Sequence, residues 1–205
     1  QGNGLLGVMV WGEANVLRLT LGRADLWDHR GGMAWTADMS YANVRRCLES
    51  GNEAELRRIF ENVSARGDQP KNPSVVPIGR LEIDFGTGAR LRTGALDLRD
   101  GTIRVRVQRK RAVHQLQIRL DMNRPVVAIN LPKMPGRARV TCVPAWRYVG
   151  AYLKSIAFAP PEHFADKSLT GWTQALPADP DVCVGYRRKG DDLFIAVARG
   201  QESRP

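Results

Sequence analysis

The sequence predicts a mainly β protein, a large antiparallel sandwich of two sheets with a short two-helix excursion near residues 41–66. Three observations predict this fold. Apolar and polar residues alternate over many short segments, which is the pattern of strands with one buried face. Turn-forming residues separate these segments. Hairpins therefore follow one another without the regularly interspersed helices of a doubly wound sheet.

The first hairpin is predicted from two apolar segments, Leu5–Trp11 and Val16–Leu21, with turn-forming residues 12–15 between them. The next segment, Ala24–Ser40, mixes Asp, Gly and aromatic residues without a period. We expect an ordered loop there.

Residues 40–67 predict two short helices. Ser40 is suited to cap the first helix, and Asn52 with Glu55 three residues later is suited to begin the second. Gly67 is expected to end it. The apolar stripe of the first helix is Tyr41, Val44 and Leu48, and that of the second is Leu56, Ile59, Phe60 and Val63.

Residues 78–144 predict a run of strands, and Asp100-Gly101 is a strong hairpin turn within it. The final hairpin is predicted over residues 182–197 with its turn at 189–192. The segment from Pro144 to Pro180 contains most of the remaining prolines and aromatic residues, and we assign no element to it. The expected inward rows are Leu81, Ile83 and Phe85; Ile103, Val105 and Val107; Leu116, Ile118, Leu120 and Met122; and, at the end, Val182, Val184, Tyr186, Leu193, Ile195 and Val197.

Composition limits the possible functions. The chain has 205 residues, is 43% hydrophobic and carries a formal charge of +10. Much of this charge is arginine that alternates with apolar residues, as in Ile103–Arg111, which indicates a solvated strand face. Because no stacking motif or helix-turn-helix pattern accompanies it, nucleic-acid binding is only a second alternative. No apolar run is long enough to span a bilayer, so no membrane partner is expected.

Motifs for catalysis or metal binding are not recognisable. Cys47, Cys142 and Cys183 are single and far apart, so we expect small buried side chains and no zinc site. There is no phosphate-binding loop and no GxSxG motif, and the sequence indicates no cofactor and no metal. Among the histidines, His114 is expected to be structural or solvated. His29 and His163 lie in expected loops as candidates for ligand contacts.

Two pairs of acids deserve comparison as glycosidase candidates. Glu82 and Asp84 alternate with apolar residues, so they are expected to face solvent on a strand. Asp25 and Asp28 flank Trp27 in an irregular segment, where an indole face and acid groups suit a sugar. The alternative is that Trp27 packs on its own domain, and the sequence leaves both interpretations open.

The opening residues GNGLLGVMVWG, the following strand and ADLWD resemble the amino-terminal domain of family 95 glycoside hydrolases, the α-L-fucosidase and α-L-galactosidase group. They also resemble a related domain of unassigned function at the front of similar hydrolases. Later segments continue the resemblance: VRRCLESGNEAELRRIFE, then VPIGRLEIDFGTGARLRTGALDLRDGTIRV, and finally GWTQALPADPDVCVGYRRKGDDLFIAVARG. One departure is Leu26-Trp27-Asp28, where the fucosidases have Leu-Trp followed by small residues, and it argues against a simple transfer of fucose specificity.

The resemblance implies a supersandwich that precedes an α/α-barrel catalytic domain in a longer chain. In that family the catalytic residues lie in the barrel, so no catalytic residue is assigned here. The function implied is a non-catalytic amino-terminal domain of a glycoside hydrolase, with carbohydrate and the barrel as partners; a stand-alone carbohydrate-binding module is the alternative. The substrate-loop candidates are Trp11, Trp27, Asp28, His29 and Arg30.

Residues 1–205 are expected to form one domain and to be an amino-terminal fragment of a longer enzyme, because the chain opens next to an apolar strand without an initiator Met. An export signal ahead of Gln1 would make the protein secreted or periplasmic. The sequence alone leaves the compartment open.

Overall fold

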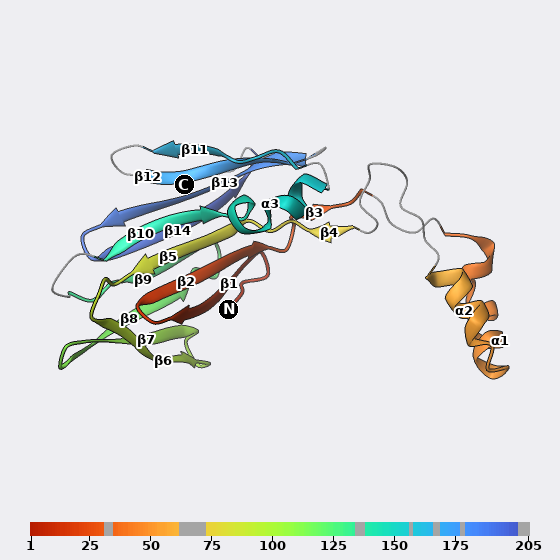
Figure 1. Ribbon diagram of the computed structural model, residues 1–205, viewed down its shortest axis with the longest axis horizontal. Helices are drawn as coiled ribbons and strands as arrows, with labels where there is room; N and C mark the ends of the chain where they lie inside the picture. The colour runs from red at the N-terminus through yellow and green to blue at the C-terminus, as the bar shows by residue number, and fades with distance from the viewer. Residues whose placement is uncertain are drawn as a thin grey trace.

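The computed structural model of the protein describes residues 1–30, 35–61, 73–133, 138–155, 158–165, 169–176 and 179–200. These residues form two antiparallel sheets packed face to face, with a helical excursion beside them (Figure 1). The predicted sandwich class is confirmed.

The smaller sheet has the strand order β1-β2-β5-β10. Its strands are β1 (Leu6–Glu13), β2 (Val16–Arg23), β5 (Gly79–Asp84) and β10 (Arg139–Pro144). The β1–β2 hairpin has the predicted place, with a two-residue turn of Ala14 and Asn15 between the paired residues Glu13 and Val16. A two-residue turn of this kind needs a left-handed first residue, and Ala14 has a φ of 53°.

The larger sheet has the order β11-β12-β13-β14-β9-β8-β7-β6. Its strands are β6 (Ala89–Asp97), β7 (Thr102–Arg109), β8 (Ala112–Leu120), β9 (Val126–Asn130), β11 (Glu162–Ala165), β12 (Leu169–Leu176), β13 (Asp179–Lys189) and β14 (Asp192–Arg199). In Figure 1 the smaller sheet lies in front of this sheet. The last predicted hairpin, β13–β14, is confirmed, with Lys189 paired to Asp192 across the predicted turn.

The core lies between the two sheets, and the alternation in the sequence explains which residues enter it. Leu19 and Ile83 of the smaller sheet are fully buried, as are Val107 and Ile195 of the larger one. Most members of the predicted inward rows are buried. Ile103 and Tyr186 are partly buried and pack against the core, and Met122 is 71% exposed because β8 ends at Leu120.

The helical excursion contains η1 (Ala37–Met39), α1 (Tyr41–Glu49) and α2 (Glu53–Phe60). Both predicted caps are confirmed. The Ser40 hydroxyl accepts a hydrogen bond from the Asn43 N–H, and the side-chain Oδ1 of Asn52 accepts one from the Glu55 N–H. Figure 1 shows the excursion set apart from the sandwich. The predicted positions Val63 and Gly67 lie outside the described residues.

The Pro144–Pro180 segment contains elements that the sequence did not predict. Helix α3 (Trp146–Ser155) follows β10 directly and has non-helical dihedrals at Val149. Strands β11 and β12 follow it. In the loop expected at 24–40, a two-residue ribbon forms between β3 (Trp27–Asp28) and β4 (Ser74–Val75). Among the described helices, none has the length and apolar character needed to cross a membrane.

Candidate functional site

The outer face of the smaller sheet carries the candidate site. Along β1 the side chains of Leu6 and Val8 are buried in the core, whereas Met9 is 60% exposed. The same alternation on β2 buries Leu19 and Leu21. Two strands thus present their other side chains on one solvent-facing surface.

A shallow groove of about 650 Å³ lies on this face, and we call it the glycine groove. Gly7 lies directly opposite Gly22 in the β1–β2 register, so the floor there is bare backbone. A Cβ added at Gly22 would meet no atom within 4 Å, which shows that no neighbouring side chain fills the space. Met9 and Thr20, the next pair on the same face of the sheet, border this floor, and Trp27 also lines the groove.

Trp27 is held in place and still accessible. Its Nε1 donates to the carbonyl oxygen of Ala24 at 3.0 Å, and its backbone pairs with Val75. The imidazole of His29 lies nearly parallel to the indole, with the ring centroids 6.5 Å apart. The residue is nevertheless 39% exposed. The interpretation that Trp27 packs on its own domain is thus supported by these contacts, and the indole is also accessible at the groove; sugar binding stays a prediction.

Asp28 is a buried fixing point for the same loop. Its Oδ1 accepts from the backbone N–H and the Nε of Arg30, at 3.0 and 2.9 Å, and its Oδ2 accepts from the same guanidinium at 2.9 Å. The guanidinium also lies 5.7 Å from the ring centre of Phe158. Burial raises the pKa of Asp28, but the hydrogen bonds from Arg30 and the nearby positive charge act in the opposite direction, and the net pKa is lowered. Asp28 stays ionised and positions the chain on either side of His29.

Asp25 fixes the start of the loop. Its two oxygens accept a bidentate pair of 2.9 Å hydrogen bonds from Arg23, whose side chain is fully buried. Arg23 also donates to the carbonyl oxygen of Val197 at 2.8 Å, and Arg199 lies 3.5 Å from Asp25. Burial raises the pKa of Asp25, but the hydrogen bonds and charge of Arg23, together with a backbone hydrogen bond and the charge of Arg199, act in the opposite direction, and the net pKa is lowered. The loop is thereby bonded to the last strand of the larger sheet.

Trp11 lies elsewhere on the outer face, in a cluster with arginines that we call the tryptophan–arginine cluster. The Arg18 guanidinium is 4.9 Å from the Trp11 ring centre, and that of Arg80 is 5.8 Å from it and 4.6 Å from the Tyr148 ring. Glu82 is ion-paired with both arginines, at 3.1 and 2.9 Å. Its prediction as a solvent-side acid is confirmed, and its charge balances a cationic surface.

The other candidate residues are dispersed. His163 is on strand β11 and exposed, and His114 is half-buried on β8. All three cysteines are free; Cys47 and Cys183 are buried as predicted, and Cys142 is partly buried. Burial raises the pKa of the Cys142 thiol to about 12, so it is protonated at neutral pH and a poor nucleophile.

Several carboxylates in the described part of the chain are ion-paired with arginines, which opposes a role for those groups as general acids. A general acid at neutral pH needs a raised pKa. Hydrogen bonds from Arg99 lower the pKa of Asp97, and hydrogen bonds from Arg124 lower that of Asp121. Within the described ranges, no group of three or more His, Cys, Asp or Glu side chains is arranged to hold a metal ion.

Of the five loop candidates, the structure brings four together around one short segment, Trp27 to Arg30, and separates Trp11 from them. The partners that sequence reasoning missed are the glycine pair, Met9, Arg80 and Tyr148. The glycines were visible in the opening motif, but their direct pairing depends on the hairpin register. Arg80 and Tyr148 come from distant segments, and no local pattern joins them.

The fold and site thus define a β-sandwich with an accessible aromatic groove on one sheet face. In the comparisons with known proteins, no family model matches this chain, and no curated protein matches it.

Proposed function

We propose that the protein is the non-catalytic amino-terminal domain of a glycoside hydrolase and that it contacts the glycan through the glycine groove. The observation that carries the proposal is the pairing of a bare floor, Gly7 opposite Gly22, with the half-exposed indole of Trp27. A flat floor admits a sugar ring without side-chain clashes, and an aromatic face offers large apolar contact area for it.

The rigidity of the loop supports a binding role. Two bidentate acid–arginine pairs, Asp25 with Arg23 and Asp28 with Arg30, hold the chain on both sides of Trp27. An indole that is already ordered loses little conformational entropy when a ligand binds. The loop is therefore preorganised for contact.

The state of the acids supports a non-catalytic role for this chain. Asp25 and Asp28, the acids nearest the groove, both have lowered pKa values and both serve as acceptors for arginine. Neither suits proton donation to a leaving group. In this proposal, chemistry belongs to an α/α-barrel domain, and the sandwich contributes contact area to the substrate.

A stand-alone carbohydrate-binding module is the second candidate. It is favoured by the accessibility of the groove in this chain, where Trp27 is 39% exposed beside the bare floor of Gly7 and Gly22.

The test compares two tryptophans. We would titrate the chain with a panel of soluble oligosaccharides by calorimetry, using the wild type, Trp27→Ala and Trp35→Ala. Trp35 is 82% exposed and does not line the groove, so its removal controls for loss of a surface indole. The stand-alone module predicts binding by the wild type and Trp35→Ala and a large loss with Trp27→Ala. Flat titrations across the panel refute that module.

The hydrolase proposal is tested by kinetics of the longer enzyme. Trp27→Ala is expected to raise KM and leave kcat unchanged, since it removes contact made equally in ground and transition states. Trp35→Ala is expected to change neither. Unchanged kinetics with a lower Tm for Trp27→Ala would leave the indole a purely structural role and contradict the proposal.

A further inference from the structure

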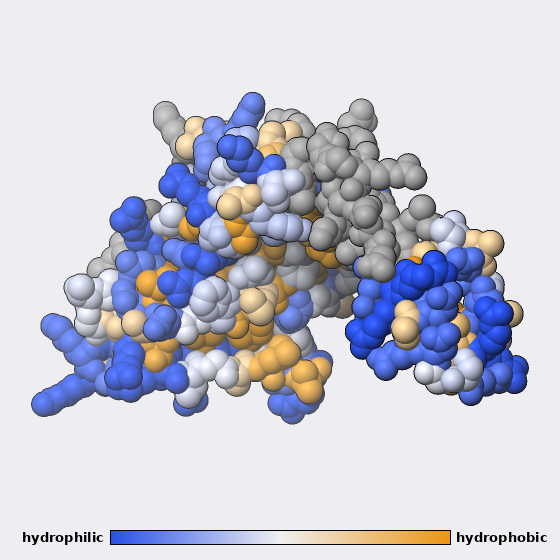
Figure 2. Space-filling model, turned by 45° about the vertical axis from the view of Figure 1, so that its right-hand side comes forward, coloured by the Kyte–Doolittle hydropathy of each residue, from blue (hydrophilic) through white to orange (hydrophobic). Residues whose placement is uncertain are grey.

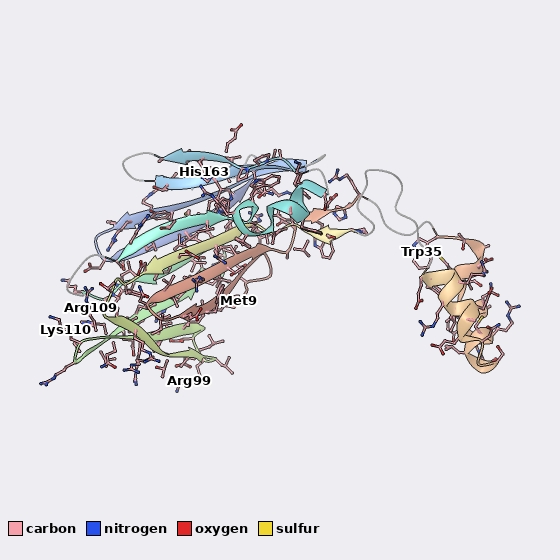
Figure 3. All side chains as sticks on the ribbon, viewed as in Figure 1. Met9, Trp35, Arg99, Arg109, Lys110 and His163 are labelled. Atoms are coloured by element: carbon pink, nitrogen blue, oxygen red, sulfur yellow. The ribbon has the colours of Figure 1, made fainter. Side chains whose placement is uncertain are left out.

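The tryptophan–arginine cluster adjoins the glycine groove on the outer face of the smaller sheet. Trp11 lies opposite Arg18 in the β1–β2 register, and Met9 lies opposite Thr20 on the side nearer the groove. Thr20 links the two sites, because it lines the groove and its hydroxyl accepts a 2.9 Å hydrogen bond from Trp11 Nε1. Figure 2 shows hydrophobic and hydrophilic surface intermixed over the sandwich, and Met9, labelled in Figure 3, lies on β1 between the two sites. A ligand that extends from the groove along β1 reaches the cluster next.

The two arginines of the cluster have hydrogen-bond donors that the protein does not use. Each guanidinium lies over an aromatic ring, Arg18 over Trp11 and Arg80 over Tyr148, at 4.9 and 4.6 Å from the ring centres. Stacking engages the face of a guanidinium and leaves the N–H groups at its edge available. Within the described part of the chain, no Nη atom of Arg18 or Arg80 donates a hydrogen bond to a protein acceptor.

The cluster also keeps an excess of positive charge. One oxygen of Glu82, Oε1, contacts the Nε atoms of both arginines, at 3.1 and 2.9 Å. Two guanidinium charges therefore face one carboxylate. Tyr148 adds no second negative charge, because burial raises the pKa of its hydroxyl although the charge of Arg80 acts in the opposite direction. All three charged side chains are partly buried, where an added anion is attracted more strongly than in open solvent.

We propose that the tryptophan–arginine cluster is a second subsite of the glycan-binding face and that it takes an acidic sugar. The ring of the sugar lies against the exposed indole of Trp11. Its carboxylate or sulfate group accepts hydrogen bonds from the Nη groups of Arg18 and Arg80, whose planar forks suit an anion with several oxygens. This inference rests on the proposed function, since it names the kind of sugar that the same face contacts.

The test observes the two sites separately by NMR of the indole N–H groups. The Nε1–H of Trp11 is bonded to Thr20 and that of Trp27 to the Ala24 oxygen, so each signal reports on one site. The chain is titrated with trigalacturonate and its methyl ester, which differ in the charge of the carboxyl groups. A second pair is a sulfated galactose oligosaccharide and its desulfated form. Trp→Phe variants assign the two signals.

The inference expects an acidic sugar to shift the Trp11 signal and to bind about tenfold more tightly than its neutral counterpart. Both forms are expected to shift the Trp27 signal. A response to one acidic pair only supports the inference and identifies carboxylate or sulfate as the group that fits.

The failures of the two proposals give different spectra. Equal affinity for acidic and neutral forms, with shifts at Trp27 alone, overturns the acidic subsite and leaves the glycan proposal standing. Shifts at Trp11 with the acidic forms and none at Trp27 support the acidic subsite and contradict the role of the glycine groove. No shift at either indole overturns both proposals.

Arginine variants separate a specific site from the general attraction of a chain with a formal charge of +10. Arg80→Gln is expected to abolish most of the tenfold preference for the acidic form. The matched control is Arg106→Gln, which removes the same charge from an exposed residue of β7 in the larger sheet and should keep the preference. Equal losses in the two variants would assign the preference to net charge and overturn the inference.

A third variant tests the inference even where Arg80→Gln folds poorly. Glu82→Gln removes the carboxylate that competes for both arginines, so it is expected to strengthen binding of the acidic form by about threefold. Binding of the neutral form should stay unchanged. Unchanged or weaker binding of the acidic form by a Glu82→Gln variant with a native amide spectrum overturns the inference.

Discussion

The sandwich and the helical excursion of this protein are stabilised in opposite ways. In the sandwich, side chains from both sheets such as Leu19 and Ile195 are fully buried. In the excursion, α1 buries only Cys47 and α2 only Ile59. Figure 2 shows the excursion as a mostly hydrophilic surface beside the sandwich.

The difference shows which interactions stabilise each part. The sandwich depends on contacts between residues far apart in the chain. The excursion depends on local interactions, namely two N-caps and exposed i, i+4 pairs such as Arg57 with Glu53 at 2.7 Å. Exposed pairs of this kind contribute little each, so the excursion is expected to unfold locally before the sandwich does.

The largest change in the free energy of unfolding is expected from truncating a side chain in the sandwich core. Phe85→Ala removes a ring that is 2% exposed, and it should lower the free energy of unfolding by about 3–5 kcal/mol. Leu48→Ala is the matched truncation in the excursion, at a residue 65% exposed, and should change it by less than about 0.5 kcal/mol. Urea titrations monitored by tryptophan fluorescence measure both. Similar losses for the two variants would remove the distinction between the regions.

An intermediate and pH-dependent change in stability is expected at Asp25 and Arg23, the ion pair that attaches the Trp27 loop to the sandwich. Because the folded pKa of Asp25 lies below its ordinary value, its ion pair with Arg23 stabilises the folded state above about pH 4 and loses this contribution as the pH falls through the lowered pKa. Wild type should therefore have a higher Tm than Asp25→Asn at pH 7, and the two should converge in acid.

The control for this pH dependence is an acid of the excursion. Asp38 is ion-paired with Arg58 but its side chain is 53% exposed. Asp38→Asn should change Tm much less than Asp25→Asn at pH 7. A difference between wild type and Asp25→Asn that stays constant from pH 7 to pH 3 would contradict the proposed role of the ionised carboxylate.

The smallest effect is expected from a helix cap and should stay within the excursion. Asn52→Ala removes the side-chain acceptor of the Glu55 N–H and should destabilise α2 by about 1 kcal/mol. Hydrogen exchange should accelerate in α1 and α2 and remain unchanged at core amides such as that of Ile83. Faster exchange at Ile83 would show that the two parts unfold together.

Much of the fold follows from the sequence because alternation and local capping leave direct signals. Leu81, Ile83 and Phe85 alternate with polar residues and are buried. The caps Ser40 and Asn52 precede their helices as predicted. The apolar stripe on the first helix predicted burial less well, since Tyr41 is 80% exposed. Periodicity identifies one side of a helix but does not say which part of the protein covers that side.

The candidate site was only partly predictable. Trp27 was recognised from its loop, and the burial of Asp28 against Arg30 depends on a close turn that composition does not indicate. Within α3, the apolar residues Trp146, Val149 and Leu153 have the spacing of one helix face. The many prolines and aromatic residues in the surrounding segment made this pattern hard to recognise in the sequence. Cross-strand partners such as Gly7 and Gly22 require the register, which only the folded hairpin fixes.

The bond between Arg23 and the Val197 carbonyl has a consequence for the order of events during synthesis. The two residues are 174 positions apart, so the first hairpin emerges from the ribosome long before its buried guanidinium meets its acceptor. Contacts of such separation slow folding and leave early segments exposed in the meantime. The loop that carries Trp27 is among the first parts to be made, yet it gains this contact only after β14 has been synthesised.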